Sequence, residues 1–402
     1  MTSTFGWLDT DPAQRRRMLE VVDLFKDAGS LDELGIGSIR DTLSDTMFPG
    51  TSTLHTRLRY VLFIPWLLQR AASAQRPEEM AERFRASEFA LIDALKNGGE
   101  AHGVIGSSAG RSLKRLPSSV YWAALGTWGI RTSNHSAATH FRRASDLRHL
   151  SPRAARTEDG EASELVPASG IDPHLPAPPD RLLQEATFAL RPEDEQYLSD
   201  RIAAATRGSL LAWLVHHPPA ELPDNVWDLD LTSAPTELRD VVDHAHRFRT
   251  AIHGASVLYN LMLARKRAAH SPGSDDDAVA YFEDHLAAWR DEFHNTRTLE
   301  GWDRSAWWAT IRRRNPRLNL RTQLFVDSWL DLIASTDDIA SSADAHALIL
   351  RREAALKGTR ARLTNQSALD RWSGESGMNP LTYRWEIARN HLNDLYAARE
   401  QS

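Results

Sequence analysis

Residues 117–131 read Pro-Ser-Ser-Val-Tyr-Trp-Ala-Ala-Leu-Gly-Thr-Trp-Gly-Ile-Arg, and this stretch carries the sharpest indication of fold in the chain. Apolar side chains recur at helical spacing after Pro117, and proline suits the first turn of a helix because that turn needs no amide hydrogen there. Gly129 predicts the helix end, because glycine adopts positive φ without strain. We therefore expect a helix that begins at Pro117 and ends near Trp128, followed by an extended Ile130.

Two shorter helical patterns precede this one, over about 88–97 and 107–116. The three together are typical of a winged-helix-like module at about 88–150, in which the third helix faces DNA. The candidate nucleic-acid-binding residues are the hydroxyl and basic side chains of this segment: Ser118, Ser119, Arg111, Lys114, Arg115, Arg131, Arg142 and Arg143. Two alternatives stay open, a winged helix that docks proteins and a three-helix packing without a wing. The third helix carries no Lys, Arg, Asn or Gln that would read bases.

Charge is unevenly spread along the chain. The net charge is −6, yet residues 101–150 hold seven Lys or Arg and one acid, whereas residues 151–180 hold two Arg and six acids. Such local asymmetry points to an anionic partner more than the total charge does. The chain has 43 Arg and five Lys, so each single Arg is weaker evidence of phosphate binding than usual.

The remaining sequence predicts a mainly α, multi-helical protein. We expect a helical N-terminal domain at 1–150, a linker or long loop at 151–180, where Pro, Ser, Gly and Glu are frequent, and a helical C-terminal domain at 181–402. A helix is also expected to start at Thr51–Thr53 and to kink or end at Pro65. The other expected helices are 12–28, 36–47, 78–97, 192–206, 209–216, 236–268, 278–297, 303–314, 320–335, 342–357 and 379–399.

Several functional classes are excluded or disfavoured. The chain has no cysteine, so disulfides, zinc–thiolate sites and thiol nucleophiles are ruled out. No phosphate-binding NTPase loop, zinc-hydrolase motif or serine-hydrolase elbow is present, and we expect no cofactor and no metal. Met1 to Arg17 lacks the apolar core of a secretory signal, and the apolar run at 60–68 is too short to span a bilayer. The expected location is cytoplasmic, with no membrane partner.

A polar cluster lies between apolar helices near the N-terminus. Asp41 and Asp45 are one helical turn apart, and two antiparallel helices would bring them near Arg57 and Arg59, with His55 beside them. An enzyme of unknown reaction with a site at Asp41, Asp45, His55 and Arg57 is one interpretation. The alternative is a structural network of salt bridges and helix caps, with an anion held at Thr51–Thr53 as a variant.

Two later segments mix tryptophan with arginine. Trp302, Trp307 and Trp308 alternate with basic residues up to Arg321, which suits either base stacking or a helix with an aromatic core face and a solvated basic face. The block from Leu356 to Tyr396 contains Trp372 and Trp385, which suit either interface anchors or ordinary core. If this block is an interface, one of the two indoles should be partly exposed.

Several stretches resemble an uncharacterised bacterial family, catalogued as a domain of unknown function. They are Phe5-Gly-Trp-Leu-Asp9, Glu33-Leu-Gly-Ile-Gly-Ser-Ile-Arg-Asp41 with Phe48-Pro-Gly-Thr-Ser-Thr53, Pro117-Ser-Ser-Val-Tyr-Trp122 with Trp128-Gly-Ile130, Tyr259-Asn-Leu-Met-Leu263, and Lys357-Gly-Thr-Arg-Ala-Arg-Leu-Thr-Asn365 with Tyr383-Arg-Trp385. The resemblance implies a phage-defence context and a helicase or nuclease as protein partner, by association alone.

These observations predict a non-catalytic helical adaptor, or a nucleic-acid-binding component, of a bacterial DNA-processing or phage-defence system. The basic segment at 101–150 and the resemblance carry this prediction together. Nucleic acid and other proteins are the expected partners, and the sequence does not separate DNA from RNA. The alternative is the enzyme built around Asp41, Asp45, His55 and Arg57.

Overall fold

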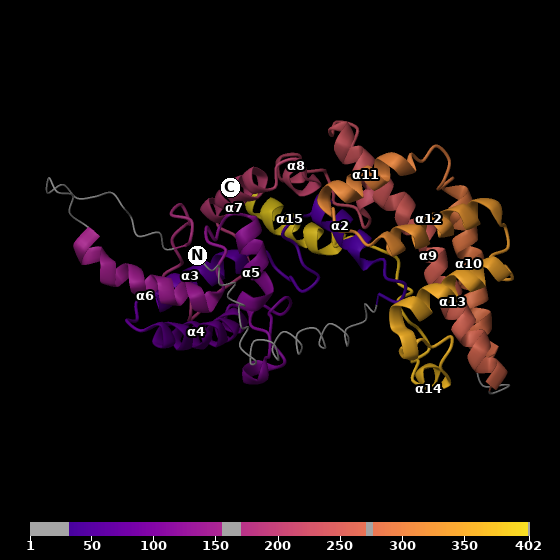
Figure 1. Cartoon of the computed structure of the whole chain (residues 1–402). Coiled ribbons are helices and arrows are strands. Elements are labelled where there is room, and N and C mark those ends of the chain that lie inside the picture. Colours follow the sequence, from indigo (N-terminus) through magenta and orange to yellow (C-terminus); the bar gives the residue numbers. More distant parts are fainter. Residues whose placement is uncertain (1–31, 155–169, 271–275, 401–402) are drawn as a thin grey trace, which may run out of the picture. The chain divides into compact units, whose positions relative to one another are not determined.

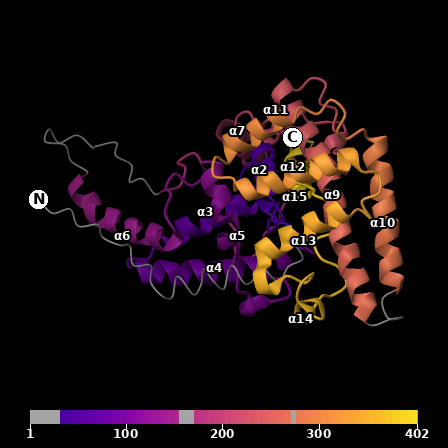
Figure 2. The same ribbon diagram turned by 45° about the vertical axis from the view of Figure 1, so that its right-hand side comes forward.

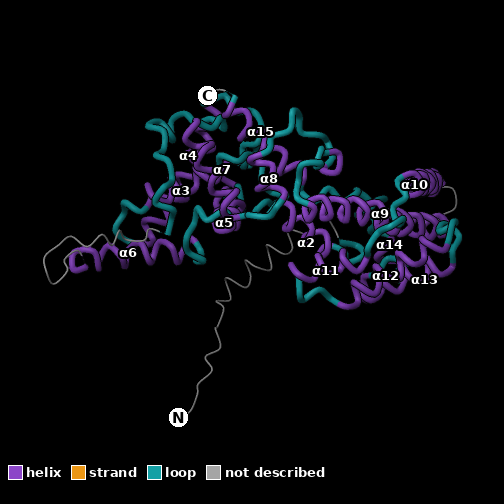
Figure 3. Tube along the Cα trace, turned by 90° about the horizontal axis from the view of Figure 1, so that it is seen from above, coloured by secondary structure: helices purple, strands orange, loops and turns teal. Residues whose placement is uncertain are grey.

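The computed structural model describes residues 32–154, 170–270 and 276–400 (Figure 1). Over these ranges the chain is mainly helical and contains no strand, as the tube in Figure 3 shows, which confirms the predicted multi-helical class. None of the helices in these ranges has the length and apolar character needed to cross a bilayer. The helix expected at 12–28 lies outside the described residues.

The chain divides into two compact units. The first unit comprises Met1–Thr42 and Asp243–Leu381, and the second comprises Leu43–Val242 and Thr382–Ser402. The cuts between them fall inside helices α2 and α9 and after Leu381. Half of the predicted linker, residues 155–169, lies outside the described residues, so the division at 151–180 stays a prediction.

The first unit is built on the long helix α9. Trp289 and Trp329 both donate to α9 carbonyl oxygens, of Thr250 at 2.7 Å and of Ala251 at 2.8 Å. Gly254 permits this packing, because a Cβ there would lie 2.4 Å from the Trp289 ring. Figures 1 and 2 show α9 and α10 side by side. The elements of this unit are α2 (Gly37–Met47, in part), α9 (Thr236–His270, in part), α10 (Asp276–Asn295), α11 (Arg304–Arg314), α12 (Leu320–Ser335), α13 (Ala343–Lys357), η3 (Gly358–Arg360) and α14 (Gln366–Leu369).

The second unit has an aromatic core around α3 and α5. Tyr60, Phe63, Tyr121 and Trp128 are fully buried there. The C-terminal helix α15 packs on α7 and α8 (Figure 1), where the Tyr396 hydroxyl donates to Leu214 O at 2.6 Å. The elements are α3 (Tyr60–Ala71), α4 (Pro77–Asn97), η1 (Gly110–Ser112), α5 (Pro117–Thr127), α6 (Ala137–Ala154), α7 (Pro192–Ala205), α8 (Leu210–His216), η2 (Val226–Asp228) and α15 (Trp385–Arg399).

Most helix boundaries agree with the sequence, and three do not. Helix α3 begins at Tyr60 rather than at Thr51–Thr53, and Pro65 lies inside it without ending it. The amides of Arg57 and Leu58 bond instead to the Tyr121 hydroxyl and the Asp394 carboxylate, so tertiary contacts hold residues 51–59 outside a helix. Helix α15 begins at Trp385 rather than at 379, because Tyr383 and Arg384 have φ of 53° and 64°. Between Ser107 and Leu116 the short 3-10 helix η1 is the only helical element.

Candidate functional site

Four of the candidate basic residues lie at the surface of the second unit. Arg111 lies in η1, Lys114 follows it, and Arg142 and Arg143 lie on α6; all four side chains are exposed. None of them forms an ion pair with a described residue. Arg143 contacts the ring of His135, and Arg142 donates to the Thr139 hydroxyl at 3.4 Å. Arg115 is half-buried.

The N-terminus of α5 is closed by a carboxylate from the preceding helix. Glu88 of α4 is 1% exposed, and its Oε1 accepts a hydrogen bond of 2.8 Å from the Ser118 amide. Burial raises the pKa of Glu88 to about 7, against the opposing hydrogen bonds from Ser118. Ser119 turns its hydroxyl to Leu116 O. The helix end expected to face nucleic acid is therefore already capped, and no local sequence signal links Glu88 to it.

Arg131 supports the turn after α5. Its guanidinium lies 4.9 Å from the centre of the Trp122 ring and donates to the backbone oxygens of Trp122 and His135, both at 3.5 Å. Burial lowers the pKa of Arg131. As predicted, Gly129 has positive φ, of 68°. The only β-pairing found in the described residues here is an isolated bridge between Arg131 and Ile171, so the winged-helix module is not confirmed.

The two arginines of the N-terminal polar cluster make ion pairs that the sequence does not suggest. Arg57 binds Asp394 of α15 at 2.7 Å, and Arg59 binds the fully buried Asp194 of α7 at 2.9 Å. Burial acts to raise the pKa of Asp394 and outweighs the opposing effect of Arg57. The predicted pairing of these arginines with Asp41 and Asp45 is therefore wrong, because acids far along the chain occupy them.

The acids of that cluster have their own partners. Asp41 binds the neighbouring Arg40 at 3.1 Å, and Asp45 binds Arg384 at 2.6 Å. Arg384 also donates to Thr51 O at 3.0 Å, which ties the segment before α15 to the loop before α3. Asp41 and Asp45 are each about half exposed, with side-chain values of 47% and 50%. Both carboxylates are therefore engaged in ion pairs, and whether the cluster has a role beyond these contacts stays a prediction.

His55 lies in the aromatic core of the second unit. Its ring stacks on Tyr121, with centroids 4.0 Å apart and planes 8° apart, and it lies 5.5 Å from the ring of His391. Burial lowers the pKa of His55 to about 4 and that of His391 well below its usual value. Both rings are therefore neutral at pH 7. A buried imidazole with so low a pKa is a poor general base, because it binds protons only in acid.

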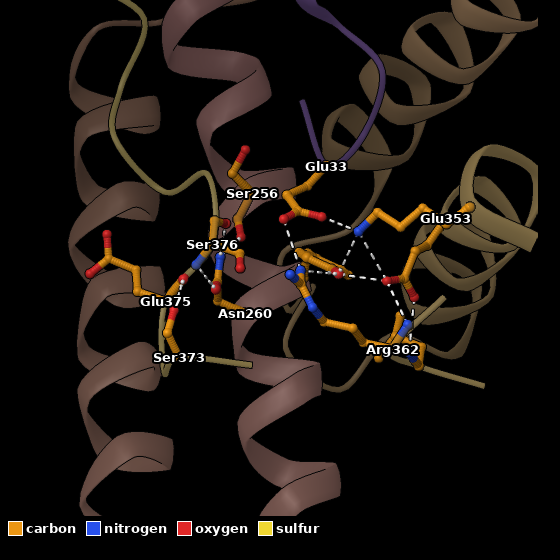
Figure 4. A network of polar contacts seen from close by, with 11 residues as sticks. Glu33, Ser256, Asn260, Glu353, Arg362, Ser373, Glu375 and Ser376 are labelled. Atoms are coloured by element: carbon orange, nitrogen blue, oxygen red, sulfur yellow. Dashed lines mark hydrogen bonds and ion pairs between the residues drawn. The ribbon is translucent and has the colours of Figure 1, made fainter. Parts of the chain in front are cut away.

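A second polar network, which sequence reasoning did not assemble, lies inside the first unit (Figure 4). Glu353 of α13 is fully buried and accepts hydrogen bonds from the Tyr259 hydroxyl at 2.6 Å and from the amides of Arg362 and Leu363, both at 2.9 Å. These bonds lower the pKa of Glu353 against the effect of burial, which would raise it.

Glu33 completes this network. It accepts from Arg362 at 2.8 Å and pairs with Lys357, which also lies 3.2 Å from Glu353. Figure 4 shows Glu33, Glu353 and Arg362 joined in one network of polar contacts. Three of the stretches that carry the family resemblance thus meet here, through Glu33, Tyr259 and the segment from Lys357 to Arg362. Because two carboxylates are balanced by two cations, the cluster is a closed network that holds chain segments together.

The tryptophan-rich segments are core. Trp302, Trp307 and Trp308 are 8%, 0% and 6% exposed, so these indoles do not stack bases. The basic side chains beside them are exposed: Arg312, Arg313, Arg314, Arg317 and Arg321. Trp372 and Trp385 are 3% and 2% exposed, which contradicts the interpretation of these two as interface anchors.

These features define a multi-helical protein in which the carboxylates of the two polar clusters are ion-paired and in which both units carry exposed basic side chains. Among the described residues, no group of three or more His, Asp or Glu is placed to hold a metal ion. The chain belongs to a family of unknown function, DUF6361, whose model matches residues 2–399. No curated protein and no solved structure matches the chain.

Proposed function

We propose that this protein is a non-catalytic, helical nucleic-acid-binding component of a DNA-processing or phage-defence system. The supporting observation is the exposure of Arg111, Lys114, Arg142 and Arg143, none of which is ion-paired with a described residue. Exposed cations of this kind can approach phosphates and release condensed counterions, which drives binding to nucleic acid. The system-level role rests on the family resemblance.

The proposed binding depends on phosphates more than on bases. Helix α5 carries no Lys, Arg, Asn or Gln that could read bases, and the amide of Ser118 near its N-terminus already donates to Glu88. Tyr121 is buried, with its hydroxyl bonded to the backbone of Thr56 and Arg57. We therefore expect similar affinity for different sequences, with a steep dependence on salt.

The non-catalytic part of the proposal follows from the polar cluster. Arg57 is paired with Asp394, Asp45 is paired with Arg384, and His55 is neutral and buried at pH 7. An enzyme centred on these residues would need them to face a common open pocket. The alternative enzyme with a site at Asp41, Asp45, His55 and Arg57 is accordingly not favoured.

An adaptor role is favoured by a different surface, in the first unit. Leu320 and Leu324 of α12 are 64% and 56% exposed, the largest values among the large hydrophobic side chains exposed in the described residues. The exposed Arg317 and Arg321 are neighbours of Leu320 in sequence. Apolar side chains bordered by cations suit a partner protein that presents acidic groups around an apolar contact.

Fluorescence anisotropy with a short duplex and a short single strand, at several salt concentrations, tests the nucleic-acid proposal. The variants Arg111→Ala/Lys114→Ala and Arg142→Ala/Arg143→Ala should each weaken binding about tenfold and reduce the salt slope by roughly two. The matched control is Arg76→Ala/Arg297→Ala, which removes two exposed arginines that are already paired with Glu79 and Glu300. Absence of binding at low salt, or equal losses in the control, contradicts the proposal.

The adaptor role is tested separately by purification from the native host. Leu320→Ser/Leu324→Ser should lose a co-purifying acidic protein, because these side chains are exposed and their loss leaves the core intact. Leu54→Ser, an exposed leucine of the second unit, is the control. Co-purification that is equal in all three proteins contradicts the adaptor role.

A further inference from the structure

We propose that a cavity in the second unit binds a small organic anion, with a carboxylate or phosphate head joined to an apolar body. The cavity has a volume of about 570 Å³ and lies between α3, the segment before α7 and the end of α15. This size falls in the range of small-molecule sites, which are mainly apolar with a few converging polar groups. The inference does not depend on the proposed nucleic-acid surface.

The charged side chains that line the cavity are mostly basic. They are Arg59, Arg181 and Arg191, against the single acid Glu185. Arg181 and Glu185 are both well exposed and 3.6 Å apart, so water weakens their mutual attraction and the Arg181 guanidinium remains available to an anion. Three guanidinium groups around one cavity favour carboxylate or phosphate, which arginine can bind in a bidentate manner.

Arg59 supplies the buried charge of this site. It is 4% exposed and donates to Thr187 O at 3.0 Å and to Asp194 at 2.9 Å, and its Nε has no hydrogen-bond partner among the described residues. Burial lowers the pKa of Arg59, against the opposing effect of Asp194. The guanidinium is thus held in an environment that disfavours its charge.

One buried acid serves two arginines at this point. Asp194 is fully buried and also binds Arg191 at 2.6 Å. Glu193 lies 3.0 Å from Arg191 but is 55% exposed, so solvent screens it. The buried Arg59 and the half-buried Arg191, whose side chain is 31% exposed, therefore share one buried carboxylate. An anion in the cavity would balance the second of these two cations, which is the electrostatic reason to expect one.

Apolar side chains form the walls of the cavity. Phe63, Leu182 and Leu190 are buried lining residues, and Pro179 and Pro192 add rigid apolar surface. These walls would remove the apolar part of a ligand from water, at about 25 cal/mol per Å² of apolar surface. A simple inorganic anion gains nothing from them. We therefore expect organic anions to bind more tightly than inorganic phosphate.

Isothermal titration calorimetry on the full chain tests the site with three small probes and inorganic phosphate. Phenyl phosphate and 3-phenylpropionate carry the two candidate head groups, and 3-phenylpropanol is the uncharged counterpart of the carboxylate. We expect saturable binding of at least one organic anion to one site, with the alcohol and inorganic phosphate each about tenfold weaker or weaker. The tighter of the two anions identifies the head group.

Ala189 offers a variant that leaves the core intact, because it lines the cavity and is exposed. Ala189→Glu should weaken anion binding about tenfold through charge repulsion, whereas Ala189→Gln, of nearly equal size, should change it less than about threefold. Ala204→Glu, in a second cavity lined by Asp200, Arg207 and Trp213, is the matched control and should leave binding unchanged. Arg181→Gln, at an exposed lining residue, should weaken binding independently.

Two results would overturn the proposal. One is the absence of saturable binding of both organic anions to the wild-type chain. The other is an affinity that Ala189→Glu and Ala189→Gln change equally, because the site would then not recognise charge. Each is measurable whether or not the protein binds nucleic acid, so failure of the cavity and failure of the nucleic-acid proposal are distinguishable.

Discussion

The carboxylate of Glu353 accepts a 2.6 Å hydrogen bond from the hydroxyl of Tyr259, and both side chains are fully buried in the first unit. The two residues are 94 positions apart, one on α13 and one on α9. Two backbone amides and Lys357 donate to the same carboxylate. The buried charge of Glu353 is tolerated because both of its carboxylate oxygens accept hydrogen bonds.

Glu353→Ala should therefore destabilise the protein strongly. The change leaves the Tyr259 hydroxyl and the amides of Arg362 and Leu363 buried without their acceptor, and we expect a loss of about 3–5 kcal/mol in the free energy of unfolding. Urea denaturation followed by circular dichroism measures it. Glu300→Ala removes an exposed carboxylate of the same unit, 68% exposed and 3.7 Å from Arg297, and should cost less than about 1 kcal/mol. Equal effects of the two substitutions would contradict this reading of the network.

Glu88 should make stability depend on pH near neutrality. Its pKa is 4.5 in the usual environment and about 7 when buried at the N-terminus of α5. The folded state therefore binds more protons than the unfolded state between these values, and its stability falls as pH rises through that window. Glu88→Gln keeps an acceptor for the Ser118 amide and should remove this loss, which amounts to about 3 kcal/mol at most.

The measurement is the difference in unfolding free energy between wild type and Glu88→Gln at several pH values from 4 to 8. The unfolding free energy of Glu88→Gln should increase relative to that of the wild type as pH rises. Glu82→Gln, at an exposed position of the same helix, should run parallel to the wild type. A wild-type profile parallel to that of Glu88→Gln would show that Glu88 does not titrate in this range.

In contrast to the effect of Glu88, His55 should make the protein less stable as pH falls. Burial lowers its pKa from 6.5 to about 4, so the unfolded state binds more protons between these values. Stability is then present above pH 6.5 and is lost as pH falls towards 4. His55→Phe retains the stack on Tyr121 and cannot be protonated, so it should resist acid better than the wild type, by up to about 3 kcal/mol at pH 4. Acid titration of the circular dichroism signal checks this, with the exposed His102→Phe as control.

Gly98 and Gly99 end α4 for different reasons, which a pair of substitutions separates. A Cβ at Gly98 would lie 2.0 Å from the backbone oxygen of Ala186, whereas a Cβ at Gly99 would meet nothing within 4 Å. Gly99 instead has a φ of 84°. Gly98→Ala should lower the free energy of unfolding by about 1–3 kcal/mol or more, because the added Cβ overpacks against Ala186. Gly99→Ala should lower it by about 1 kcal/mol, because alanine disfavours a positive φ. Thermal unfolding of both variants measures the order, and a larger loss at Gly99 would contradict it.

Much of the helical architecture could be predicted from the sequence, because the signals are local. Apolar spacing at 320–335 gives the bounds of α12 as observed, and Pro117 and Gly129 mark the two ends of α5. Where local signals and tertiary contacts compete, the sequence was misleading. Thr51–Thr53 resemble a helix start, yet the backbone that follows is held by Tyr121 and Asp394.

The candidate sites were less predictable. Composition located the basic segment, and the structure places Arg111, Lys114, Arg142 and Arg143 at the surface. The composition could not show that Arg131 supports a turn or that Glu88 caps α5, because packing decides which residues these two side chains contact. The cavity beside Arg59 has no sequence signature, since its lining comes from segments far apart in the chain.

The sequence by itself determined the helical class, most of the helical segments, the two ends of α5 at Pro117 and Gly129, and that thiol chemistry is absent. The tertiary structure decided which charges meet. Arg59 pairs with Asp194, which is 135 residues away in the sequence, and Arg57 pairs with Asp394, which is 337 residues away. Helical periodicity gives no information about contacts at such sequence separations. The physical reason is that helix formation depends on neighbours within one or two turns, whereas a buried ion pair depends on where whole helices pack.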